Sequence, residues 1–87
     1  MWCAAVSARV EVLVKDKETK RPVPWTAVWL GTRKDITDER GLAVFEEVPP
    51  GTYTLRVRSL VYRPHTEDVV VEEGVNRFEV ELVYALL

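Results

Sequence analysis

The sequence has a single cysteine, Cys3, and a single histidine, His65. One thiol cannot form a disulfide within the chain or supply a cysteine-based zinc site. His65 follows Arg63-Pro64 in a polar stretch, without a second histidine or cysteine nearby, whereas a metal site needs three or four converging ligands. We therefore predict no metal and no cofactor.

Catalytic groups are equally scarce. The only serines, Ser7 and Ser59, lack the glycine-flanked turn that exposes a nucleophilic serine, and His65 is the only histidine that could act as its base. The acidic pairs at 46–47 and 72–73 fall at predicted strand ends and turns, where solvated charge is the ordinary role of such residues. These absences predict a protein that is not an enzyme.

Long apolar runs and an excess of positive charge are also missing. No apolar run approaches the roughly 18 residues that are needed to span a bilayer. A net charge of −2 gives little attraction to nucleic acid phosphates. The opening MWCAAVSA has no basic residue and too short an apolar run for an export signal. We expect neither a membrane span nor a nucleic acid partner, and the compartment stays open.

Amide side chains are almost absent, since the chain has no glutamine and only one asparagine, Asn76. Amides deamidate when hot and the desolvation cost of ion pairs falls with temperature, so a charged, amide-poor composition is typical of hyperthermophile proteins. We expect a thermophilic source. The length of 87 residues predicts one small domain, with apolar extensions at 1–7 and 83–87.

What the sequence does contain is a series of short apolar–polar alternations. Val10, Val12 and Val14 alternate with polar or outward positions, as in a strand with one buried face. Proline, glycine and polar runs separate such segments, and none has helical periodicity over ten residues. The chain predicts about seven short strands, of which the clearest are residues 9–14, 25–30, 42–48, 53–58, 69–71 and 78–82.

The turn chemistry supports this arrangement. In TDERG, residues 37–41, the Asp38 side chain can accept hydrogen bonds from backbone amides two residues on, and Gly41 can adopt a positive φ. We expect a hairpin-like reversal there. Strands with this spacing and punctuation predict two packed antiparallel sheets, that is, a β-sandwich.

The order of these motifs resembles a known family. The segments PVPWTAVWL, TDERGLAVFEEVPPGTYTLRV, residues 62–64 and GVNRFEVEL are similar to the carboxypeptidase regulatory-like domain, a member of the transthyretin-like (prealbumin-like) β-sandwich group. The similarity covers about residues 10–82. Its most specific part is the T-D-x-x-G turn followed by an inward aromatic, Phe45, and the P-P-G-T-Y-x-L turn and strand. Pattern and resemblance together predict an all-β, seven-stranded antiparallel Greek-key β-sandwich.

The resemblance also has implications for function. It implies a compact non-catalytic module of a kind often appended to enzymes, adhesins or surface proteins, and a family that is often extracellular. An enzymatic branch of the group, the hydroxyisourate hydrolases, uses several histidines and a C-terminal Tyr-Arg-Gly-Ser, which the ending VYALL lacks. The chain departs from the family at Trp25, where a small residue is usual, and at Val61, where a glycine is usual.

The second predicted strand places two tryptophans on the surface. If Thr26, Val28 and Leu30 face the core, then Trp25 and Trp29 lie on the outer face of the same strand. A register slip of one residue would bury both indoles instead, and the pattern leaves that alternative open.

Other apolar side chains extend this predicted surface. Leu42 and Val44 face outward if Ala43 and Phe45 face inward, and with the tryptophans they would form one contiguous exposed patch. Such a patch usually marks an interaction surface.

Both ends of the chain are apolar, with Trp2 in the first segment and Tyr84, Leu86 and Leu87 in the last. Free termini are normally polar, so these ends predict packing, either on the parent domain or on a neighbouring subunit. The pattern does not decide between the two.

We therefore expect a structural or protein-interaction module that forms homo-oligomers or binds another protein through its tryptophans, its ends or both. The alternative is a carbohydrate-binding module in which Trp25 and Trp29 form a stacking platform. Its hydroxyl-recognising side chains would have to come from Thr26, Arg33 and Asp35.

Overall fold

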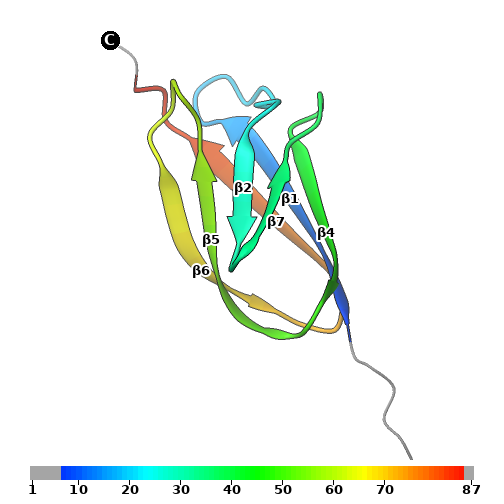
Figure 1. Ribbon diagram of the computed structural model, residues 1–87. Helices are drawn as coiled ribbons and strands as arrows, with labels where there is room; N and C mark the ends of the chain where they lie inside the picture. Colours follow the sequence, from blue (N-terminus) through cyan, green and yellow to red (C-terminus); the bar gives the residue numbers. More distant parts are fainter. Residues whose placement is uncertain (1–6, 86–87) are drawn as a thin grey trace, which may run out of the picture.

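The computed structural model describes residues 7–85, which form two β-sheets packed face to face (Figure 1). The three-stranded sheet has the order β4-β1-β7 and the four-stranded sheet has the order β3-β2-β5-β6. Their bounds are β1 (Ala8–Asp16), β2 (Ala27–Leu30), β3 (Arg33–Ile36), β4 (Leu42–Val48), β5 (Gly51–Arg58), β6 (His65–Val71) and β7 (Gly74–Leu82). The predicted seven-stranded β-sandwich is confirmed. In the part of the chain described, no helix is long and apolar enough to cross a membrane.

The core lies between the sheets and follows the predicted alternation. Val10, Val12 and Val14 of β1 are fully buried, while Arg9 is exposed and Leu13 is half-buried on the opposite face. Matching inward residues from the other sheet include Val28, Leu30, Leu55 and Val57. Each such aliphatic side chain contributes about 1.5–3 kcal/mol by leaving water. This packing fixes which face of every strand is available to a partner.

One strand pairing departs from the prediction of an antiparallel sandwich. Four of the five pairings are antiparallel, but β1 and β7 run parallel from Ala8↔Gly74 to Asp16↔Leu82. The turn at 72–73 carries the chain from β6 in one sheet to β7 in the other. Because β7 reaches β1 without a hairpin between them, no local turn signal specifies its direction.

The TDERG turn has the predicted chemistry but a different connectivity. The Asp38 carboxylate accepts hydrogen bonds from the amides of Arg40 (2.8 Å) and Leu42 (3.1 Å), and Gly41 has φ 76°. A Cβ on Gly41 would lie 2.5 Å from the carbonyl oxygen of Val14, so only glycine fits. Since β3 and β4 belong to different sheets, this reversal carries the chain between sheets and does not close a hairpin.

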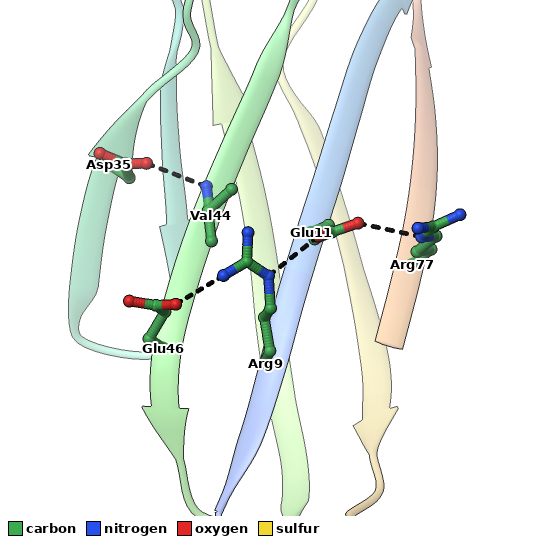
Figure 2. Close-up of polar contacts among 6 residues, drawn as sticks. All are labelled: Arg9, Glu11, Asp35, Val44, Glu46 and Arg77. Carbon is green, nitrogen blue, oxygen red and sulfur yellow. Dashed lines mark hydrogen bonds and ion pairs between the residues drawn. The ribbon is translucent and has the colours of Figure 1, made fainter. Parts of the chain in front are cut away.

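Strand β3 is absent from the predicted set because its sequence, RKDI, is polar. Its inward side chains, Arg33 and Asp35, reach the exposed edge of β4 in place of apolar packing. Arg33 Nη1 donates to the Glu46 carbonyl (2.7 Å), and the Val44 amide donates to Asp35 (3.0 Å; Figure 2). The pair satisfies backbone groups that an open edge strand would leave for another chain.

Candidate functional site

A groove of about 620 Å³ lies at one end of the sandwich, between the loop that precedes β2 and the loop that follows β5. Both predicted surface tryptophans line it. We call it the tryptophan groove, and its lining consists of residues 22–27, Trp29, Ile36 and residues 58–62.

A buried hydroxyl fixes one wall of the tryptophan groove. Thr37 is fully buried, and its Oγ1 donates to the Val23 carbonyl (2.9 Å) and accepts from the Thr26 amide (2.8 Å). The Trp25 amide donates to the Thr37 carbonyl (3.0 Å), so the residues on either side of the indole are tied to the β3–β4 connection. The loop therefore presents Trp25 from a defined backbone.

Trp25 is held in an unusual conformation. Its φ is 56°, in the left-handed region, and its side chain is 72% exposed. That region costs a residue with a Cβ about 1–2 kcal/mol, and bulky side chains enter it rarely. Such strain persists where the surroundings impose it, and it is concentrated at functional sites. Trp25 therefore combines a strained backbone with an indole that is exposed to solvent.

Trp29 is less open than the sequence predicts. Thr26, Val28 and Leu30 are buried, so the register slip that would bury both indoles does not occur. Trp29 does point outward, but it is half-buried between its neighbours on the adjoining strands: Lys34 Nζ lies 5.4 Å and Arg56 Cζ 5.7 Å from its ring centroid. Both distances are typical of cation–π contacts. Trp25 is consequently the freer of the two rings.

The predicted contiguous patch is wrong. Leu42 and Val44 do face outward and are half-buried, but they lie on the three-stranded sheet, whereas Trp29 lies on the four-stranded sheet. The outer faces of the two sheets point away from each other. Alternation along one strand gives the face of a residue, but not the sheet to which its strand belongs.

The outer face of the three-stranded sheet is electrostatically balanced. Arg9 pairs with Glu46 and Glu11, and Arg77 also pairs with Glu11, in a row across β4, β1 and β7 (Figure 2). The hydrogen bond from Arg9, followed by that from Arg77, lowers the pKa of Glu11. A smaller hollow of about 280 Å³ on this face is lined by three apolar and three charged side chains: Leu13, Leu42, Phe78, Glu11, Arg77 and Glu79.

The residues that follow β7 pack on the parent domain. The Arg63 amide donates to the Val83 carbonyl and the Ala85 amide to the Val61 carbonyl, both at 2.9 Å. Tyr84 is 53% exposed and meets Tyr62 edge to face, with centroids 5.6 Å apart. As far as residue 85, the C-terminal end thus packs on the parent domain, which was the first of the two predicted alternatives. The other predicted contact residues at the ends, Trp2, Leu86 and Leu87, lie outside the described residues.

Tyr62 anchors the second wall of the tryptophan groove. Its hydroxyl donates to Asp16 Oδ2 (2.8 Å), and this bond to a carboxylate raises the pKa of Tyr62. The Thr19 amide, together with Tyr62 and the Glu18 amide, lowers the pKa of Asp16. The wall is tied to β1 by a side chain that sequence analysis did not single out, because the partners are separated by 46 positions in the sequence.

The groove carries positive charge that the described residues do not neutralise. Arg58 lines it, and Lys34 and Arg56 flank Trp29. Within residues 7–85, no carboxylate forms a salt bridge with any of these three cations. The site can therefore accept an apolar group together with negative charge.

The proposed sugar-binding side chains are not available in the groove, because Thr26 lines it but is buried, and Arg33 and Asp35 lie outside its lining. Thr26 is buried in the loop network, and Arg33 and Asp35 are bonded to the edge of β4. His65 is half-buried, with Nε2 2.9 Å from Glu67 Oε2, and residues 7–85 contain no cluster of three potential metal ligands.

Comparison with known proteins places the chain in context. The family model for the carboxypeptidase regulatory-like domain matches residues 9–83. A search of curated protein sequences found no match. Solved structures share the fold: the TIE protein of Bacillus anthracis (11% identity, TM-score 0.79), a candidate carbohydrate-binding protein of Bacteroides uniformis (18%, 0.72) and the pilus 2b backbone protein of group B streptococcus (14%, 0.67). The alignments cover 91% of this chain, but only 17%, 42% and 42% of those proteins, respectively.

Proposed function

This chain belongs to the carboxypeptidase regulatory-like domain family, as the sequence resemblance predicted, and on that premise we propose that it is a non-catalytic interaction module that self-associates through the tryptophan groove. The observation that carries the proposal is Trp25, which is 72% exposed in a left-handed backbone conformation held by buried hydrogen bonds. We take residues 1–87 as one domain that supplies this surface.

Burial of the indole would supply much of the binding free energy. An aromatic side chain buries about 150–250 Å², so at about 25 cal/mol per Å² covering the exposed 72% of Trp25 corresponds to roughly 3–4.5 kcal/mol before the costs of association are subtracted. Ile36 (45% exposed) and Leu60 (102%) lie beside it in the groove and add apolar area. Tryptophan is also among the commonest energetic anchors of protein interfaces.

The fold neighbours are compatible with such a role. One is a pilus backbone protein, in which the comparable region is less than half of a longer chain. At 14% identity that likeness concerns the fold, and the proposal rests on the groove of this chain.

A carbohydrate-binding role is the second candidate, because one fold neighbour is a candidate carbohydrate-binding protein and Trp25 offers an open ring for stacking. Two features favour the first proposal. The groove lining is mainly apolar, and the faces of Trp29 are flanked by Lys34 and Arg56. Tryptophan fluorescence titrated with a panel of neutral and acidic polysaccharides separates the roles: a saturable change that Trp25→Ala abolishes would favour sugar binding.

The test of self-association is the mass in solution as a function of concentration. We expect the wild type to rise above the mass of a monomer and Trp25→Ala to weaken association at least ten-fold, since an interface anchor is worth about 2 kcal/mol or more. Leu42→Ala, on the opposite sheet, serves as the control and should leave association unchanged. A wild type that stays monomeric at the highest attainable concentration would end the proposal.

A further inference from the structure

The opposite end of the sandwich carries a surface that complements the tryptophan groove. We propose that the occupant of the groove is the β6–β7 turn of a second copy, so that copies associate head to tail. We call this turn the acidic tip and define it as Val70, Glu72, Glu73 and Val75. This inference rests on the proposed function and names the partner surface.

The acidic tip pairs apolar area with negative charge. Val70 is 63% exposed and Val75 is 62% exposed, on either side of Glu72 and Glu73, which are also exposed. Within residues 7–85, no cation forms a salt bridge with Glu72 or Glu73. The acidic tip therefore has carboxylates beside aliphatic side chains, which complement the cations and the apolar lining of the groove.

The acidic tip is also pre-organised. The Asn76 side chain donates to the Glu72 carbonyl (2.7 Å) and accepts from the Glu72 amide (3.0 Å), which closes the turn. Gly74 has φ 101°, and the space around the position of its missing Cβ is open to 4 Å. A turn that is closed by its own hydrogen bonds and stands clear of the body loses little entropy when it docks.

The charge of the groove is complementary to that of the acidic tip. Arg58 lies in the groove opposite Ala27, and the next row of side chains on the same outer face is Lys34, Trp29 and Arg56. The cations of the other face, such as Arg9 and Arg77, are paired with glutamates. Uncompensated positive charge at the groove and uncompensated negative charge at the tip favour one relative orientation of two copies.

The acidic tip of a chain cannot bind the tryptophan groove of the same chain. Along β5, Arg58 lies at the groove end while Gly51 pairs with Val71 beside the tip, and the seven steps between them span about 23 Å. Figure 1 shows the β6–β7 turn and the loop before β2 at opposite ends of the molecule. The contact is therefore heterologous, and each added copy leaves one groove and one tip free, so the assembly grows as a filament or closes as a ring.

The contact is small. One turn against one groove covers less than the roughly 800 Å² per partner of a stable complex, so we expect weak, concentration-dependent association. Because its charges lie at an exposed rim, added salt should weaken it.

Complementation between two variants tests the geometry. The tip variant carries Glu72→Lys and Glu73→Lys, and the groove variant carries Trp25→Ala and Arg58→Ala. In sedimentation velocity each variant alone should be monomeric at concentrations where the wild type associates. Their equimolar mixture should form a one-to-one dimer and nothing larger, because only the groove of the first and the tip of the second remain intact.

Controls separate this inference from the proposed function. Glu18→Lys with Glu39→Lys makes the same change in net charge as the tip variant, at exposed residues outside both surfaces, and should associate like the wild type. Circular dichroism verifies the fold of every variant. If the tip variant still self-associates while the groove variant does not, the head-to-tail contact is refuted and the groove stands. If the wild type is monomeric throughout, both proposals fall.

Discussion

At the scale of single residues, Trp25 combines a left-handed backbone with an indole that is 72% exposed. Its neighbours Thr26 and Thr37 are buried and mutually bonded, while the indole that they position stays in water with a left-handed backbone. The alternation of the strand predicted that this side chain points outward. It could not predict the positive φ, because this backbone conformation is usually occupied by glycine and a tryptophan in the sequence does not indicate it.

Comparison of glycine with alanine at this position tests the strain. Trp25→Gly should be more stable than Trp25→Ala by up to about 1 kcal/mol. Glycine avoids the penalty of about 1–2 kcal/mol for a left-handed backbone, but part of this gain is offset because glycine loses more conformational entropy on folding. The same pair at Trp29, within β2, should show the opposite order by about 0.5–1 kcal/mol. Urea denaturation measures both differences. An alanine variant at position 25 as stable as its glycine counterpart would show that the backbone there is unstrained.

At the scale of elements, the turns follow the sequence more closely than the strands do. The TDERG turn was predicted with its Asp38 bonds and its glycine conformation, because both arise from neighbouring residues. Strand β3 was not, since Arg33 and Asp35 point inward only to reach backbone groups on the edge of β4, a tertiary contact that no local pattern contains. The predicted start of β2 at Trp25 was also wrong, because the strand begins at Ala27 and its start depends on tertiary contacts that the local pattern does not contain.

The Asp38 turn makes stability depend on pH. Hydrogen bonds from the amides of Leu42 and then Arg40 lower the pKa of Asp38 in the folded state. The stabilisation is complete above the ordinary aspartate pKa of about 3.9 and is lost as the pH falls through the lower folded value. Asp38→Asn should therefore be less stable near neutral pH and should lose less stability on acidification. Urea midpoints measured from about pH 7 to about pH 2 check this; parallel curves for the two proteins would contradict it.

At the scale of the whole molecule, the two outer faces of the sandwich have different characters. The three-stranded sheet pairs its arginines with glutamates, whereas the four-stranded sheet leaves Lys34, Arg56 and Arg58 around the tryptophans. The sequence predicted the sandwich and the family. It wrongly placed Leu42 and Val44 in one patch with the tryptophans, because the sheet to which a strand belongs depends on the topology of the whole chain. The parallel pairing of β1 with β7 was missed for the same reason.

The groove as a contact surface is the central claim, and the indole N–H resonance of Trp25 in nuclear magnetic resonance spectra tests it most directly. Trp25→Phe assigns the signal, and the resonance is then followed from dilute to concentrated protein. We expect the Trp25 indole and the Leu60 amide to shift progressively with concentration, while the Val44 amide on the opposite sheet stays constant. Trp25 and Leu60 signals that do not move across the whole range would contradict the account.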